Sequence, residues 1–158
     1  MLHMYLIVVR MRCFEREEFR NLQQQFIDNF FFDCERMMHV NHGITSTGAR
    51  QRHLKDLFLR WRGITLACDE GIVKGDAVLA SAVWRNLYKA REDVDMRHLA
   101  AIVGWMRYNL KALEAMDDED FLLGGSKIFK WPARNELLLV DQPAGAMAQP
   151  LPAKKAAK

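Results

Sequence analysis

The sequence predicts an all-α protein, an irregular bundle of about five helices followed by a flexible tail. Apolar residues recur at the three- and four-residue spacing of amphipathic helices, and no stretch of any length alternates as a strand does. The first proline is Pro132, so no proline interrupts a helix before that point. We expect a helical domain over residues 1–132 and a largely disordered segment over residues 133–158, where alanine, proline and lysine accumulate.

The first two expected helices differ in character. Residues 1–14 carry apolar side chains on every side, which is typical of a helix at the centre of a core. A central helix at the first residue indicates either that a preceding segment is absent or that a partner covers one side. Residues 15–40 have one apolar stripe that runs from Phe19 to Met37, and Asp33 falls inside it.

Three further helices are expected after a Thr- and Ser-rich loop. Residues 48–69 have a stripe that includes Phe58 and Trp61, and the following Asp-Glu-Gly is expected to end that helix. Residues 75–90 begin with Asp76, a good N-cap, and have Asn86 inside the apolar stripe. Residues 96–116 form the fifth helix. The acidic run at 117–120 marks its end, because a helix C-terminus disfavours negative charge.

Composition excludes several classes of protein. Half of the 158 residues are hydrophobic, yet no apolar run approaches the ~20 residues that span a bilayer. The net charge of +3 permits contact with acidic surfaces without requiring nucleic acid. The three cysteines are odd in number and scattered, which favours a reducing compartment over a disulfide framework. Neither a nucleophile elbow nor a phosphate-binding glycine loop is present, and we expect no cofactor.

Asp33 and Asn86 are polar residues on predicted core stripes. A buried polar group without a partner costs about 1–3 kcal/mol, so each needs hydrogen bonds. Arg50 lies on the inner side of its own helix and is a candidate partner for Asp33. We interpret the two residues as a buried polar framework that sets helix register, with a binding or catalytic role as the alternative.

Two other patterns admit a chemical function. His39 and His42 have the spacing of metal ligands and, with Asp69 or Glu70, could serve a helical metal-dependent enzyme. A second alternative is RNA or ribosome binding by a basic helix face. That face consists of Arg50, Arg52, Lys55, Arg60 and Arg62. It lacks the interleaved aromatic residues that stack on single strands, since Phe58 and Trp61 are expected to point inward.

Ordered motifs from Leu2 to about Met116 resemble the ubiquinol–cytochrome c chaperone family. They include Val8-Val-Arg-Met-Arg12, Phe30-Phe-Phe-Asp33, Cys68-Asp-Glu-Gly71, Gly75-Asp-Ala-Val-Leu-Ala80 and Trp84-Arg-Asn-Leu-Tyr88. The added residues 91–95 resemble the fungal mitochondrial branch. The resemblance implies a non-enzymatic assembly chaperone for the cytochrome bc1 complex (respiratory complex III). Family members in mitochondria carry an N-terminal extension with a targeting segment, so we expect this domain to be N-terminally truncated.

The resemblance also implies partners and a location. Such a chaperone acts with a small assembly-factor partner at the tunnel exit of the mitochondrial ribosome and receives newly made cytochrome b. It lies on the matrix side of the inner membrane, peripheral to it and without a transmembrane helix. We assign a client or partner surface to motif residues and to part of the basic face, namely Asp69, Glu70, Trp84, Arg85, Arg52, Arg60 and Arg62. Asp33 and Asn86 stay in the buried framework.

Overall fold

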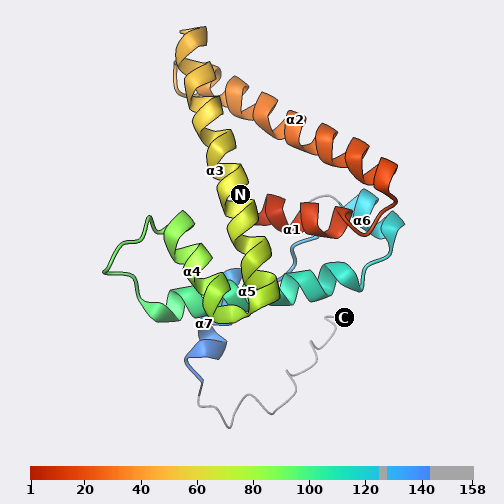
Figure 1. Ribbon diagram of the computed structural model, residues 1–158, viewed down its shortest axis with the longest axis vertical. Helices are drawn as coiled ribbons and strands as arrows, with labels where there is room; N and C mark the ends of the chain where they lie inside the picture. The colour runs from red at the N-terminus through yellow and green to blue at the C-terminus, as the bar shows by residue number, and fades with distance from the viewer. Residues whose placement is uncertain (125–127, 143–158) are drawn as a thin grey trace, which may run out of the picture.

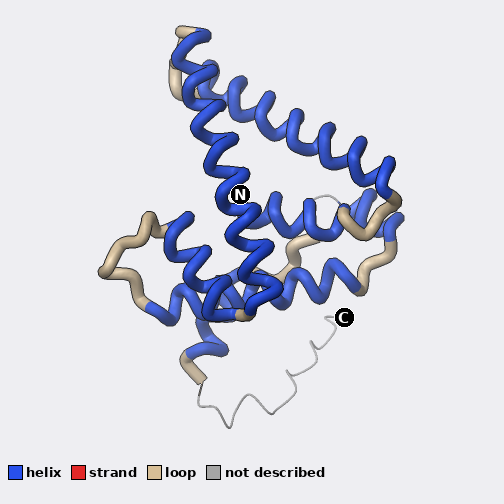
Figure 2. Tube along the Cα trace, viewed as in Figure 1, coloured by secondary structure: helices blue, strands red, loops and turns tan. Residues whose placement is uncertain are grey.

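The computed structural model describes residues 1–124 and 128–142, and this part of the chain is helical without a strand (Figure 2). The all-α class is therefore confirmed, but the seven helices exceed the expected number of about five. In chain order they are α1 (Leu2–Met11), α2 (Arg16–Val40), α3 (Thr47–Lys74), α4 (Asp76–Leu87), α5 (Met96–Glu114), α6 (Asp118–Gly124) and α7 (Ala133–Val140).

The expected central helix is α1. Tyr5, Leu6 and Val8 have no exposed surface, and α1 packs against both α5 and α2. The rest of the core comes from one side each of α3 and α4, from α5 and from Phe121 of α6. Its members include Trp61, Leu79, Trp105, Met106 and Leu113. Burial of a large apolar side chain contributes about 1.5–3 kcal/mol, so this cluster is the main source of stability.

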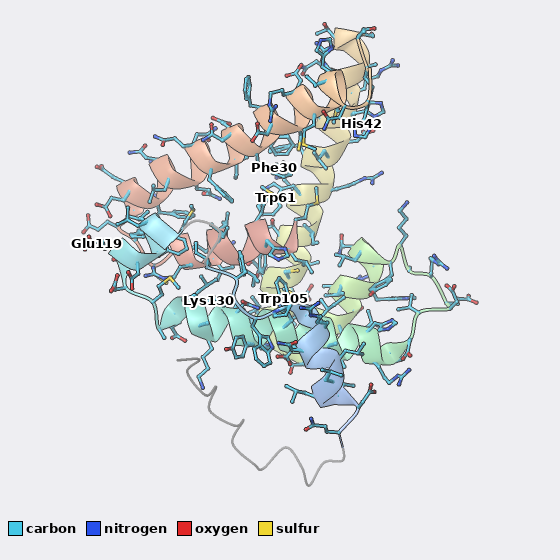
Figure 3. The ribbon with its side chains drawn as sticks, turned by 180° about the vertical axis from the view of Figure 1, so that it is seen from behind. Phe30, His42, Trp61, Trp105, Glu119 and Lys130 are labelled. Carbon is cyan, nitrogen blue, oxygen red and sulfur yellow. The ribbon has the colours of Figure 1, made fainter. Side chains whose placement is uncertain are left out.

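The longest two helices diverge from the turn at residues 41–46 (Figure 1). His42 lies at that turn, at the far end of the molecule from α5 (Figure 3). No residue of α2 is buried, although it is 25 residues long. Half-buried side chains such as Phe26 and Phe30 make its contact with the core. Because α2 packs on the rest of the protein along one side only and diverges from α3, both long helices expose much side-chain surface to solvent.

The α3–α4 interface is the most extensive in the described structure. We expected α3 to end at the Asp-Glu-Gly motif, but it continues to Lys74 and ends at Gly75, whose φ is +109°. Gly71 lies inside the helix and is buried against Leu79, where an added Cβ would lie 2.5 Å from the Leu79 Cα. That glycine therefore permits close approach of two helices and does not stop one.

The helix α4 is shorter than expected, since it ends at Leu87 and is followed by Lys89 and Ala90 with φ of +54° and +55°. Leu79, Ala82 and Val83 are buried as the stripe predicted, but Leu87 is 41% exposed. Asp76 does not cap the helix with its side chain and instead accepts a hydrogen bond from Arg107 Nε at 2.8 Å.

The two helices that the sequence did not reveal are α6 and α7. The acidic run ends α5, as expected, but it also begins α6. Asp117 accepts from the Asp120 amide at 2.7 Å, and a helix N-terminus favours the negative charges that follow. Residues 133–140 were expected in the flexible tail, yet they form α7, which packs on α5. Residues 143–158, the rest of that tail, lie outside the described residues.

The predicted buried polar framework is wrong on both residues. Asp33 is exposed and pairs with Arg36 on its own helix at 3.3 Å, because α2 never enters the core. Arg50 instead pairs with Glu35 at 3.3 Å and donates to the Ile44 and Thr45 carbonyls of the turn. Asn86 is also exposed, and its amide donates to the Ala82 carbonyl one turn earlier in α4.

Candidate client and partner surface

A groove of about 860 Å³ lies between α2 and α3. Its apolar lining consists of Ile27 and Phe31 from α2 and of Leu54 and Phe58 from α3. The rings of Phe31 and Phe58 meet edge to face, with their centroids 5.6 Å apart, and Phe58 remains 43% exposed. Phe58 was expected to point fully inward, but the divergence of α2 from α3 leaves it half covered.

Polar side chains surround this apolar lining. They are Arg20, Asn21, Gln23, Gln24, Asp28, Gln51 and Lys55. Gln24 donates to Asp28 at 2.9 Å, so part of the rim is ordered by its own hydrogen bonds. An apolar centre with a polar rim is the usual anatomy of a protein interface.

The outer side of α3 carries a second apolar feature, which we call the α3 stripe. Leu59, Leu66 and Val73 are spaced by seven residues and are 57%, 73% and 86% exposed. Successive residues of an α-helix are separated by 100° around its axis. By this spacing Arg52 and Arg62 lie on the same side of α3 as the three apolar residues, and all five fall within a sector of about 80°. Apolar side chains at a seven-residue interval are typical of a seam that receives another helix.

The basic residues of α3 do not form the single face that we predicted. Arg52, Lys55 and Arg62 share the α3 stripe's side of the helix, and Lys55 lines the groove toward α2. Arg60 lies about 80° beyond Arg52 and lines a different cavity, beside Met1 and Trp105. Arg50, at the start of α3, is engaged in the turn.

Asp69 connects α3 to α1. Its carboxylate accepts from the Tyr5 hydroxyl at 2.8 Å and from both terminal nitrogens of Arg12, at 2.7 and 3.1 Å. Burial and the hydrogen bond to Asp69 raise the pKa of Tyr5 above its ordinary value of 10. The bidentate pair with Arg12, which follows α1, and the bond from Tyr5 link α3 to α1, so the Asp69 carboxylate is engaged within the domain.

Replacing Tyr5 by phenylalanine is expected to lower the free energy of unfolding by about 1–2 kcal/mol at pH 7, because the Asp69 carboxylate loses the hydrogen bond that the buried hydroxyl donates. The raised pKa means that the folded state keeps a proton which the unfolded chain loses above pH 10. This contribution is therefore complete below pH 10 and declines as the pH rises further. Urea unfolding of both proteins at pH 7, 9 and 10.5 checks this, and a difference that grows above pH 10 contradicts it.

The remaining motif residues lie near the α3–α4 hairpin and its loop. Glu70 is exposed and pairs with Lys74 at 2.7 Å, which lowers the pKa of the Glu70 carboxyl. Trp84 is half buried, and its indole N–H donates to the Arg91 carbonyl at 2.7 Å, so it anchors the loop after α4. Arg85 is exposed and makes only a long 3.4 Å bond to the Ser81 carbonyl.

The hypothesis of a metal site at His39, His42, Asp69 and Glu70 is wrong. His42 lies in the turn before α3 (Figure 3), and Asp69 lies 22 residues into that helix, counted from Thr47. At 1.5 Å per residue, the 22 residues of helix between Thr47 and Asp69 span about 33 Å, so the His42 and Asp69 side chains cannot share a metal ion. Among residues 1–124 and 128–142, no group of three or more His, Cys, Asp and Glu side chains is placed to hold a metal ion.

Two structural residues were missed by sequence reasoning. Arg10 is only 6% exposed and donates to the Leu113 and Met116 carbonyls at 2.9 Å. Asn109 is 2% exposed and donates to the Trp105 carbonyl at 2.7 Å. The signal for Asn109 was available, because it lies three residues after Met106 on the apolar stripe of α5.

These features define a class of protein, a helical domain with surfaces suited to associate with other proteins. The chain belongs to the ubiquinol–cytochrome c chaperone family, whose model, described as "Ubiquinol-cytochrome C chaperone", matches residues 1–131. It is 36% identical over 126 residues to "Protein CBP3, mitochondrial" of Saccharomyces cerevisiae. It is 30% identical over 131 residues to "Ubiquinol-cytochrome-c reductase complex assembly factor 1" of Xenopus laevis. No solved structure matches the chain.

The matched regions differ in their share of each protein. The alignment to the yeast protein covers 80% of this chain and 38% of the yeast protein. The alignment to the Xenopus protein covers 82% of this chain and 62% of that protein. The chain thus spans less than two thirds of either relative.

Proposed function

We propose that this chain is the helical chaperone domain of an assembly factor for the mitochondrial cytochrome bc1 complex. The family match over residues 1–131 carries the proposal. The names of the relatives support it, since one is called mitochondrial and another a complex assembly factor. The domain binds its clients without catalysing a reaction.

The proposed client is newly made cytochrome b, and the α2–α3 groove is its proposed binding surface. A membrane protein exposes apolar helices before it is assembled, and these need cover away from the bilayer. The groove offers aromatic and aliphatic side chains on two long helices, one of which has no buried residue. The protein itself needs no membrane span for this role, and no helix in the described residues is long and apolar enough to be one.

The α3 stripe is the proposed surface for a small assembly-factor partner. Its apolar residues, Leu59, Leu66 and Val73, match the spacing of a partner helix. Arg52 and Arg62 beside them, and Arg85 on α4, are exposed cations that suit an acidic partner or the mitochondrial ribosome near its tunnel exit. The proposed location is the matrix side of the inner membrane, peripheral to the bilayer.

Crosslinking during mitochondrial translation tests this function. A photoreactive amino acid replaces Phe58 in the groove, or Leu138, which is 66% exposed on α7 and serves as the control. The protein is directed to mitochondria in which translation products are radiolabelled. We expect a labelled cytochrome b adduct from position 58 and little from position 138. Recovery of RNA without any translated protein would instead favour the RNA-binding alternative.

The variant Phe58→Ser is expected to weaken client binding by about 5- to 30-fold, the factor for about 1–2 kcal/mol at an aromatic contact. The folded state loses one aromatic pair, worth about 0.5–1.5 kcal/mol, so the domain stays folded. Co-purified labelled cytochrome b is the measurement, with Leu138→Ser as the matched control. Equal recovery with both variants places the client elsewhere.

A further inference from the structure

A second cavity, of about 800 Å³, lies on the opposite side of α3 from the residues that line the groove. The beginning of α1, the middle of α3, the end of α4, the middle of α5 and the segment before α7 surround it. Figure 3 shows Trp105 near this junction, where α5 and α7 come together. The size falls within the range of about 300–1,000 Å³ that is usual for small-molecule sites.

The wall of this cavity is aliphatic and aromatic. Its main apolar members are Leu2, Ile64, Ile102, Trp105, Phe129 and Trp131. Both indole N–H groups are already used: Trp105 donates to the Trp131 carbonyl at 2.9 Å, and Trp131 donates to Glu136 at 2.6 Å. The tryptophans therefore offer carbon surface and no free donor to whatever enters.

The charges at the cavity have one sign. Among the described lining residues, Arg60 and Lys89 carry permanently charged side chains, His3 is the other titratable side chain, and none has a carboxylate. Neither Arg60 nor Lys89 forms an ion pair with a described residue. Lys89 has a φ of +54°, a left-handed conformation that a lysine rarely adopts. This conformation ends α4, where the Ala90 amide donates to the Trp84 carbonyl at 3.2 Å.

We propose that this cavity binds a long-chain carboxylate, with its hydrocarbon chain against the tryptophan wall and its head group between Arg60 and Lys89. The apolar lining lowers the free energy of the chain by removing it from water. The carboxylate provides a negatively charged partner for Arg60 and Lys89, which form no ion pair with a described residue. This is a ligand site distinct from the client groove, and it goes beyond the assembly function.

A flat polar ligand such as a nucleotide fits the same cavity less well. Its aromatic base would stack on an indole, but the ring nitrogens and exocyclic groups would face carbon. Each unpaired buried polar group costs about 1–3 kcal/mol. The polar side chains Asn86, Arg60 and Lys89 are exposed and lie at the cavity's mouth, where a head group would lie, and the exposed His3 ring packs against Trp105 and Phe129.

Quenching of tryptophan fluorescence by brominated hexadecanoate tests the proposal, below the concentration at which the acid aggregates. We expect saturable quenching by the acid, and at least tenfold weaker quenching by the brominated alcohol of equal chain length. The double variant Arg60→Gln with Lys89→Gln is expected to weaken binding of the acid at least tenfold. Both positions are exposed, so its Tm should match that of the parent.

The double variant Lys55→Gln with Arg62→Gln is the matched control. It removes the same charge from exposed positions of α3 that do not line this cavity, and it should bind the acid as the parent does. Equal binding of acid and alcohol, equal losses in both double variants, or no saturable quenching would each overturn the proposal.

Discussion

The variant Arg10→Ala is expected to lose about 3 kcal/mol of stability and to melt roughly 6–12 °C lower. The Arg10 guanidinium holds the end of α5 by donating to the Leu113 and Met116 carbonyls, which lie in the last turn of the helix and just beyond it, where few backbone donors remain. It also lies over the rings of Phe14 and Phe121, 5.3 and 5.1 Å from their centroids. Charged hydrogen bonds of this kind contribute about 1.5–3 kcal/mol each, and cation–π contacts add to them.

Two variants separate these contributions. Asp118, which accepts from Arg10 at 2.5 Å, is 65% exposed, so Asp118→Asn should cost no more than about 1 kcal/mol. Arg10→Lys keeps the charge but lacks the planar guanidinium that reaches two carbonyls. Its loss of stability should therefore lie between those of Asp118→Asn and Arg10→Ala. Thermal and urea unfolding provide the comparison. If Asp118→Asn costs as much as Arg10→Ala, the ion pair and not the carbonyl contacts holds this end of the molecule.

The variant Gly71→Ala is expected to destabilise the domain by about 1–3 kcal/mol and to loosen the α3–α4 hairpin. A Cβ at this position would lie 2.5 Å from the Leu79 Cα and 2.8 Å from the Leu79 backbone nitrogen. These are backbone atoms, so no rotation of a side chain relieves the overlap and the helices must separate. The gain in helix propensity, up to about 1 kcal/mol, offsets only part of this cost.

Gly63→Ala, in the same helix, is the matched control. Nothing lies within 4 Å of a Cβ added at Gly63, so the substitution should stabilise the protein by about 0.5–1 kcal/mol through helix propensity alone. The measurement is urea unfolding of both variants under one set of conditions. If Gly71→Ala stabilises the protein as Gly63→Ala does, or if both destabilise it, the close contact at Gly71 is contradicted.

Gly71 also gives a physical meaning to two family motifs. Cys68-Asp-Glu-Gly71 and Gly75-Asp-Ala-Val-Leu-Ala80 face each other across the α3–α4 interface, where Gly71 meets Leu79. Asp69 of the first motif binds Tyr5 of α1 and Arg12, the residue that follows that helix. The two motifs thus contain the residues at which α1, α3 and α4 meet. The sequence alone suggested a partner surface at Asp69, but in the structure its carboxylate bonds to residues of the same domain.

The sequence by itself determined the all-α class, the five longer helices and the central place of α1. These follow from local periodicity, since a helix apolar on every side has to be covered on every side. Arg10 escaped prediction because its partners are more than 100 residues away at the end of α5.

Only the tertiary structure decided which part of each apolar stripe is buried in the core. Asp33 and Asn86 lie on apolar stripes, yet the stripe of α2 and the end of α4 extend past the neighbouring helices. Periodicity shows which side of a helix prefers burial, but burial also requires another element at that position. In this protein α2 diverges from α3 (Figure 1), and that divergence leaves the predicted core aromatic Phe58 as part of an open groove.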